Sequence, residues 1–323
     1  MGEGVGMMST MSRIRLDWAE NGTLPQNLVI KIAAENDTNR NVAQQFNLYL
    51  KEVSYYRDLS ALTSARSPRI YALDIDSDQN FFILMEDVTN YRMGNQVTGA
   101  TLDETMICVT ELAKLHAAFW NRIDGVDWLP HISGSDNARN MALGAEVGWK
   151  QTLENFGEFV PGSIRDAHVK YLQRIPMIQE QLDQEPRTLI HGDFRMDNML
   201  FGVRKDDAPL LIVDFQGPLK GNGIQDLAYL LSHSVQTEVR RQCESQILDH
   251  YVDTLRLEGI REYSTDKAWA DYRLAVLYCW TVAVVIAGTM DPANERGYAW
   301  MSKMVERNGL AIEDLDCLEL LDS

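Results

Sequence analysis

The stretch His191-Gly192-Asp193-Phe194-Arg195-Met196-Asp197-Asn198, followed by Ile212-Val213-Asp214-Phe215, decides how this chain folds and what chemistry it carries. It places an aspartate, an asparagine five residues later, and a second aspartate at the end of an apolar run. Phosphoryl transfer from ATP requires such a set, because a carboxylate must orient the acceptor hydroxyl and oxygen ligands must hold Mg²⁺ on the phosphates. Asp193 is therefore the candidate base, and Asn198 and Asp214 are the candidate Mg²⁺ ligands.

Arg195 and His191 flank the candidate base and have expected roles of their own. Arg195 lies two positions after Asp193, where a guanidinium can donate hydrogen bonds to the equatorial oxygens of a transferring phosphoryl group. An ion pair with Asp197 or another acid is the alternative for this arginine. His191 is expected to anchor the loop through hydrogen bonds rather than to contact a substrate.

Lys31 is the candidate lysine for the nucleotide phosphates. It is the single charged residue of the apolar run 28–33, and burying an unpaired ammonium is costly, so a carboxylate partner is expected. We expect Glu52 to be this partner, because it lies on the apolar face of the following helix. Glu35 and Glu86 are competing candidates for the same role.

The sequences of these motifs resemble those of one kinase superfamily. Protein kinases have H-R-D-x-x-x-x-N followed by D-F-G, whereas this chain has H-G-D-x-x-x-x-N followed by D-F-Q. Together with residues 115–120 (LHAAFW) and 226–231 (DLAYLL), this resembles the aminoglycoside phosphotransferase and choline kinase superfamily, and within it the ecdysteroid kinase-like (CHK) group with its bacterial members. The motif sequence of residues 191–198 is also similar to that of kinase-like domains fused to acyl-CoA dehydrogenases. The resemblance covers nearly the whole chain and implies ATP- and Mg²⁺-dependent O-phosphorylation of a small alcohol.

The same resemblance implies further site residues. Family members use an aspartate at the place of Asp226 to hold the backbone of the catalytic loop, and capping of the helix that begins there is the alternative role. Glu86 and Val88, at the end of the N-terminal strands, are expected at the nucleotide site.

A glycine-rich phosphate loop is expected at the start of the chain. Gly2, Gly4 and Gly6 match such a loop, whose backbone N–H groups approach the nucleotide. A kinase lobe normally has a strand before this loop, so we expect either that the first strand is missing or that Met1 is not the natural start.

The pattern of elements predicts an α+β class and a bilobal protein-kinase-like fold. Residues 1–87 form the small β-rich nucleotide-binding lobe, and residues 88–323 form the large helical lobe with the catalytic loop and the acceptor site. Thr101 and Glu104 make a capping box that opens a helix through Trp120. The other elements follow from periodicity and turn signals. We expect helices over 40–62, over much of 140–185 and from 223 onward, and strands over 28–33, 69–74, 81–85, 187–191, 199–201 and 210–215.

Composition limits the partners. The net charge of the 323 residues is −17, and no basic run occurs, which argues against nucleic acid or an anionic membrane as a partner. The four cysteines show no metal-ligand spacing. The apolar run 274–288 is shorter than the roughly 20 residues of a membrane-spanning helix, so we expect a buried core helix. Residues 1–10 do not resemble a signal peptide, and we expect a cytoplasmic protein.

The acceptor is expected between the lobes, bound mainly by the helical lobe. An apolar cavity that includes Trp120 and Trp149 would suit a steroid, terpenoid or aromatic alcohol. His233, about one helical turn after Tyr229, is a third candidate for this pocket. Ordinary core packing is the alternative for all three residues. A cationic acceptor, such as an aminoglycoside or choline, would require carboxylates or an aromatic cage.

Competing functions are a nucleotide-binding but inactive regulator of the same fold, a protein kinase and a Rossmann dehydrogenase. The first is supported only by the missing strand. The second is disfavoured because eleven residues separate Asp214 from Asp226 and no alanine-proline-glutamate follows. The third is disfavoured because the glycine loop lacks its strand–helix context. The sequence does not indicate the acceptor or the oligomeric state.

Overall fold

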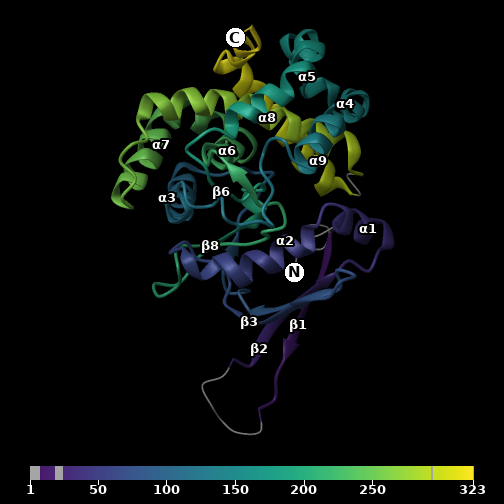
Figure 1. Cartoon of the computed structure of the whole chain (residues 1–323), viewed down its shortest axis with the longest axis vertical. Coiled ribbons are helices and arrows are strands. Elements are labelled where there is room, and N and C mark those ends of the chain that lie inside the picture. Colours follow the sequence, from purple (N-terminus) through teal and green to yellow (C-terminus); the bar gives the residue numbers. More distant parts are fainter. Residues whose placement is uncertain (1–7, 19–24, 292–293, 323) are drawn as a thin grey trace.

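The N-terminal part of the chain is a four-stranded antiparallel sheet, drawn at the bottom of Figure 1. The computed structural model describes residues 8–18, 25–291 and 294–322, so the predicted loop of Gly2, Gly4 and Gly6 lies outside the described residues. The strands are β1 (Ser9–Arg15), β2 (Asn27–Ala33), β3 (Ile70–Ile75) and β4 (Phe81–Glu86), in the order β1-β2-β4-β3. The strands predicted over 28–33, 69–74 and 81–85 are confirmed.

The helix predicted over residues 40–62 is broken. The segment consists of α1 (Asp37–Gln45), α2 (Leu48–Ser54), a π-helix (Tyr55–Leu59) and a 3-10 turn (Ser60–Leu62). The break lies at Asn47, whose φ of 53° is left-handed, a conformation that asparagine tolerates better than most residues. The kink lets α2 lie across the sheet, where Tyr49 stacks on Phe81 with ring centroids 4.5 Å apart.

The remainder of the chain is mainly helical. The helices are α3 (Leu102–Phe119), α4 (Asp136–Phe156), α5 (Gly162–Leu182), α6 (Ile224–Tyr229), α7 (Thr237–Leu257), α8 (Thr265–Thr289) and α9 (Glu295–Asp314). The predicted capping box of Thr101 and Glu104 opens α3. A π-helix (Leu230–Ser234) continues directly from α6. The predicted α+β class is confirmed.

Helix α8 is the central helix of this part and packs against α4, α6 and α9. It is the one described helix that is long and apolar enough to cross a membrane, but most of its apolar window is buried by its neighbours. The predicted core helix is therefore present. The crossing with α4 depends on glycine: a Cβ at Gly288 would lie 2.0 Å from the carbonyl oxygen of Gly148.

Short strands hold the catalytic motif. Strands β5 (Arg92–Met93), β7 (Met199–Phe201) and β8 (Leu210–Ile212) form one small sheet, and β6 (Thr188–Ile190) pairs with β9 (Leu219–Gly221). The strand predicted over 199–201 has the bounds of β7, whereas those predicted over 187–191 and 210–215 are found as the shorter strands β6 and β8. The loop between β6 and β7 carries Asp193 and Asn198, and Asp214 lies two residues after β8. The amide of Val213 donates a hydrogen bond to the carbonyl of Asn198 at 3.1 Å, so the two loops are joined.

Candidate functional site

A cleft of ≈ 340 Å³ lies between the sheet and the catalytic loops. Its walls combine apolar residues of the sheet with polar residues of the loops. Glu86 and Val88 line it as predicted, together with Val29, Lys31, Glu52, Met85, Leu200, Asp197, Asn198 and Asp214. The carboxylate of Glu86 accepts a hydrogen bond from the backbone amide of Arg69 at 3.0 Å. Glu86 is therefore not the partner of Lys31.

Lys31 forms the predicted pair with Glu52, and it also contacts Asp214. Its ammonium donates to Glu52 Oε1 and to Asp214 Oδ1, each at 2.7 Å, and the lysine is 5% exposed. Burial alone would lower the pKa of Lys31, but the charges of Asp214 and Glu52 raise it above its ordinary value, so the lysine is charged. The amide of Gln216 donates to the second oxygen of Glu52 at 3.1 Å. The glutamine that follows Asp214-Phe215 thus holds Glu52 toward Lys31.

Asp214 and Asn198, the candidate metal ligands, both line the larger cleft. Asp214 adopts a φ of 70° after β8, and Phe215 stacks on Tyr55 with centroids 3.5 Å apart, which fixes the turn. Burial alone would raise the pKa of Asp214, but Lys31 lowers it, so the carboxylate is ionised. The amide nitrogen of Asn198 donates to Asp193, which leaves its Oδ1 for a cation.

These donors fit Mg²⁺. Among the described residues no group of three or more His, Cys, Asp or Glu side chains is gathered as a metal cage. One amide oxygen and one carboxylate beside this cleft match the preference of magnesium, which keeps waters and phosphate oxygens as its other ligands.

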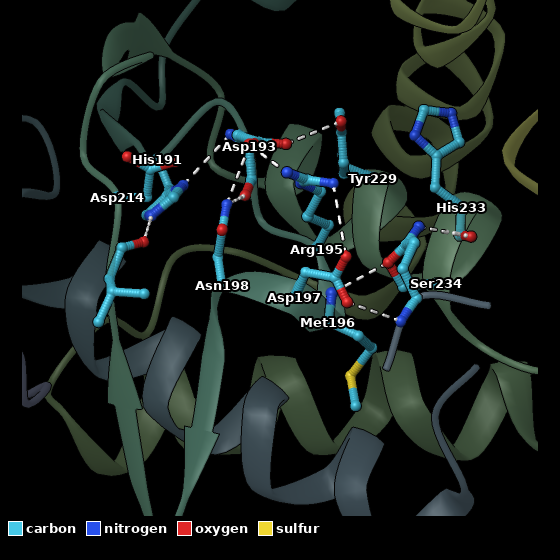
Figure 2. Close-up of polar contacts among 12 residues, drawn as sticks. His191, Asp193, Arg195, Met196, Asp197, Asn198, Asp214, Tyr229, His233 and Ser234 are labelled. Atoms are coloured by element: carbon cyan, nitrogen blue, oxygen red, sulfur yellow. Dashed lines mark hydrogen bonds and ion pairs between the residues drawn. The ribbon is translucent and has the colours of Figure 1, made fainter. Parts of the chain in front are cut away.

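Asp193 is held by three side-chain donors, shown in Figure 2. Tyr229 Oη donates to Asp193 Oδ1 at 3.0 Å. Arg195 Nε and Asn198 Nδ2 both donate to Asp193 Oδ2, at 3.2 and 2.9 Å. Asp193 is accordingly restrained as an oriented carboxylate, which suits a base whose main task is to position a hydroxyl.

Arg195 forms the ion pairs that were the alternative for this residue. Besides its bond to Asp193, its Nη1 lies 3.8 Å from Asp197 Oδ2, and its guanidinium covers the Trp300 ring at 4.9 Å. Burial alone would lower the pKa of Arg195, but Asp193, Tyr229 and Asp197 raise it above its ordinary value. The arginine is thus charged. A contact with the transferring phosphoryl group stays a prediction.

His191 and Asp226 hold the catalytic loop, as expected. His191 Nε2 donates to the carbonyl of Val213 at 3.1 Å, and its Nδ1 accepts from the amide of Asp193 at 3.2 Å. The carboxylate of Asp226 accepts from the amides of His191 and Gly192 at 2.6 and 3.0 Å. Position 192 requires glycine, because φ is 82° and a Cβ would lie 2.1 Å from the carbonyl oxygen of Gly217. His116 of α3 supports Asp226 with a contact of 3.2 Å.

A second cavity, of ≈ 180 Å³, lies on the other side of the catalytic loop. One side is polar, with Asp193, Arg195, Asp197 and Tyr229, and the other side is apolar. The apolar side comes from α8 and α9 and consists of Val282, Ile286, Met290 and Trp300. Arg296 also lines the cavity and donates to Asp197 Oδ1 at 3.1 Å.

The predicted acceptor-pocket residues do not line this cavity. Trp120 is 3% exposed and meets Tyr263 edge to face. Trp149 stacks on His168 with centroids 3.7 Å apart. His233 is fully buried behind Tyr229. Core packing, the alternative for all three, is what the structure shows, because their helix faces turn toward neighbouring helices.

Sequence reasoning missed five residues of the site, namely Asp197, Gln216, Tyr229, Arg296 and Trp300. Tyr229 could have been expected at the site, because it lies three residues after Asp226 and therefore on the same side of a helix. Asp197 was noted only as a partner for Arg195. Arg296 and Trp300 are four residues apart on one helix face, but nothing in their neighbourhood links them to a loop about a hundred residues earlier.

Comparison with known proteins agrees with this arrangement. The model of the ecdysteroid kinase-like family matches residues 3–259. Among curated proteins, "Uncharacterized oxidoreductase dhs-27" of Caenorhabditis elegans is 22% identical over 292 residues, which cover 79% of this chain and 34% of that protein. This chain therefore spans about a third of the length of that relative.

Solved structures show the same fold. A GDP complex of aminoglycoside 2'-phosphotransferase-IIIa has a TM-score of 0.56 and 15% identity, with 93% of each chain covered. Choline kinase from Cryptosporidium parvum Iowa II has a TM-score of 0.55 and 11% identity, with 99% of this chain and 94% of that chain covered. At these identities the likeness concerns the fold alone, and the predicted kinase-like fold is confirmed.

Proposed function

The chain belongs to the ecdysteroid kinase-like family, and on that premise we propose that it transfers the γ-phosphoryl group of ATP to a hydroxyl of an apolar small molecule in the cytoplasm. One observation carries this proposal: the catalytic loop separates two cavities and contributes to both. Asp193 lines the smaller cavity, Asn198 lines the larger one, and Asp197 lines both. An acceptor in the first would therefore meet a nucleotide in the second across a single loop.

The larger cavity is the nucleotide site of this proposal. Lys31 would contact the phosphates and Glu52 would orient the lysine. Glu86 and Val88, which line the same cleft at the end of the N-terminal strands, would lie beside the adenine. Asn198 and Asp214 would hold Mg²⁺, which neutralises charge on the phosphates when bound. Lys31 is already placed by two carboxylates at 2.7 Å, so little reorganisation is needed when the phosphates arrive.

The smaller cavity is the acceptor site, formed by residues of the segment 88–323. The acceptor hydroxyl donates a hydrogen bond to Asp193, and its oxygen faces the nucleotide. Because the transition state of phosphoryl transfer is loose, alignment of this hydroxyl contributes more than the strength of the base.

The walls of the smaller cavity favour an uncharged, apolar alcohol of the steroid, terpenoid or aromatic type. Ile286, Met290 and Trp300 present apolar surface opposite the loop. Two arginines, Arg195 and Arg296, line the same cavity and pair with its two carboxylates, Asp193 and Asp197, so neither carboxylate is left without a positively charged partner. The face of Trp300 is already covered by Arg195, so it cannot serve as a cage for an ammonium group. An aminoglycoside or choline is therefore disfavoured as the acceptor.

The test is mass spectrometry of a pooled library of steroid, terpenoid, aromatic-alcohol, amino-alcohol and aminoglycoside compounds incubated with Mg-ATP. Wild type is compared with Asp193→Asn, which keeps the shape of the side chain but removes its charge. We expect an apolar alcohol heavier by one phosphoryl group with wild type, and a rate at least about 100-fold lower with the variant.

A binding control separates catalysis from folding. Asp193→Asn should bind a fluorescent ATP analogue as tightly as wild type. A phosphorylated aminoglycoside as the sole product would refute the apolar acceptor. Equal product from both proteins would remove Asp193 as the base, and absence of product despite nucleotide binding would favour the inactive regulator.

A further inference from the structure

Tyr229 is a buried tyrosine whose hydroxyl reaches the candidate base. It ends α6, directly before the π-helix Leu230–Ser234, a type of helix that is frequent at functional sites. The residue is 3% exposed and lines the acceptor cavity. Its Oη donates to Asp193 Oδ1 at 3.0 Å, as Figure 2 shows.

The two oxygens of Asp193 differ in the acceptor sites they have left. A carboxylate oxygen accepts about two hydrogen bonds in good geometry. Oδ2 already accepts from Arg195 Nε and Asn198 Nδ2, so it is saturated. Oδ1 accepts from Tyr229 and retains one acceptor site. An incoming hydroxyl therefore finds its partner at Oδ1.

We propose that Tyr229 is a positioning residue that presents Oδ1 of Asp193 to the acceptor hydroxyl. The catalytic meaning of this proposal rests on the proposed function, whereas the hydrogen bond itself does not. In the reaction, the acceptor oxygen forms a bond to the γ-phosphorus while the bond between that phosphorus and the β–γ bridging oxygen breaks. The acceptor proton passes to Oδ1, ADP keeps the bridging oxygen, and Asp193 returns the proton to solvent.

The phenol is suited to this task. Burial raises the pKa of Tyr229 well above its ordinary value, and the neighbouring Asp193 charge acts in the same direction. The hydroxyl therefore stays protonated and remains a donor at every pH at which the enzyme would work. Its ring meets His233 edge to face with centroids 4.4 Å apart, so the phenol cannot swing away easily.

The experiment compares Tyr229→Phe with wild type and with Tyr278→Phe. Tyr278 is a matched control, because it is also buried and its hydroxyl bonds to Gln179 at 3.1 Å, on a different helix pair. The first readout is kcat and KM for phosphoryl transfer, with both measured at one fixed pH. The second is ¹³C NMR of protein labelled at the Asp carboxyl carbons, with the Asp193 signal assigned through Asp193→Asn.

Tyr229→Phe removes a hydrogen-bond donor from the Asp193 carboxylate. We expect the carboxyl ¹³C signal of Asp193 to change its chemical shift at a fixed pH. We also expect kcat to fall about 10- to 100-fold with little change in KM, because the carboxylate is free to turn. Tyr278→Phe should leave both the signal and kcat as in wild type. Replacing Tyr229 by 3-fluorotyrosine, a stronger donor of the same shape, should retain turnover and move the ¹³C signal in the opposite direction.

An unchanged carboxyl ¹³C signal of Asp193 in both Tyr229 variants would overturn the proposal. The NMR readout does not depend on turnover, so it tests the Tyr229–Asp193 contact separately from the proposed function. A changed signal in a protein that phosphorylates nothing would support the Tyr229–Asp193 contact and refute the proposed function.

Discussion

Lys31 Nζ lies 2.7 Å from Asp214 Oδ1 and also 2.7 Å from Glu52 Oε1. One ammonium therefore joins β2 to α2 and to the loop after β8. With both carboxylates ionised, the three charges sum to −1, which leaves an excess of negative charge beside the larger cleft. Asp214 is one of the residues that would hold a Mg²⁺ ion, and the cation would balance this excess.

Lys31→Met should weaken both folding and nucleotide binding. The change leaves two buried carboxylates without their cation, and we expect a loss of about 3 kcal/mol in the free energy of unfolding, measured with urea. Affinity for a fluorescent ATP analogue should fall at least about tenfold. Lys150→Met, at a lysine whose side chain is 88% exposed on α4, is the control. If the nucleotide affinity of Lys31→Met were unchanged, Lys31 would not be a residue that contacts the phosphates.

Asp214→Asn should remove the Mg²⁺ dependence of nucleotide binding. An amide binds Mg²⁺ much more weakly than a carboxylate, so titration with MgCl₂ should strengthen ATP-analogue binding in wild type but not in the variant. Asp249→Asn, on the exposed side of α7, should respond as wild type. If both variants retain the full magnesium effect, the metal site lies elsewhere.

Asp226→Asn should slow turnover without affecting nucleotide binding. The amide cannot accept from both His191 and Gly192 as the carboxylate does, so the loop that carries Asp193 loses its anchor. We expect kcat to fall about 10- to 100-fold. Asp271→Asn is matched, because Asp271 also accepts several buried hydrogen bonds, from Asn222 and Tyr263. It should lower stability similarly while kcat is retained, and an equal loss of kcat in both would argue for a general stability effect.

Ile286→Phe should obstruct the acceptor cavity. Ile286 of α8 lines the smaller cavity and not the larger one, so the added ring should raise KM for the acceptor about tenfold or more. The Kd of the ATP analogue should stay the same. Val147→Phe, at a position on α4 that is 67% exposed, is the control. An altered nucleotide Kd with an unchanged acceptor KM would reverse the assignment of the two cavities.

His233 should make the protein sensitive to acid. Burial lowers the pKa of His233 from 6.5 to about 3. The unfolded chain therefore binds the proton first, and stability that is present above pH 6.5 is lost as the pH falls toward 3. The expected slope is about 1.4 kcal/mol per pH unit from this residue. Urea unfolding of His233→Leu between pH 7 and pH 4 should show a shallower decline than wild type, and parallel curves would exclude this histidine as the cause.

Most of the candidate residues around the larger cleft could be selected from the sequence. Asp193 and Asn198 lie in one loop, and Asp214 lies two residues after a short apolar strand, so local spacing was sufficient to select them as candidates. The Lys31–Glu52 pair could be predicted because burying an unpaired ammonium is costly, so a lysine in a buried strand requires a carboxylate partner. The break at Asn47 was not predicted, since apolar periodicity continues across it while a single left-handed residue changes the direction of the helix.

The acceptor side could not be predicted in the same way. Large aromatic residues such as Trp120 and Trp149 are typical of binding pockets. The residue type does not indicate, however, which face of a helix packs against another helix. Tyr229 was visible next to Asp226, yet its bond to Asp193 depends on how α6 is placed against the catalytic loop.

The sequence by itself determined the fold class, the spacing of the candidate residues in the loop and the lysine–glutamate pair, because these depend on residues that are close in the chain or on the cost of burying a charge. Only the tertiary structure decided the two cavities on either side of one loop and the second partner of Lys31, which is Asp214. A cavity is the space that packed elements leave between them. The helices α8 and α9 supply its walls, and their distance along the chain from the catalytic loop leaves no local pattern that could reveal the contact.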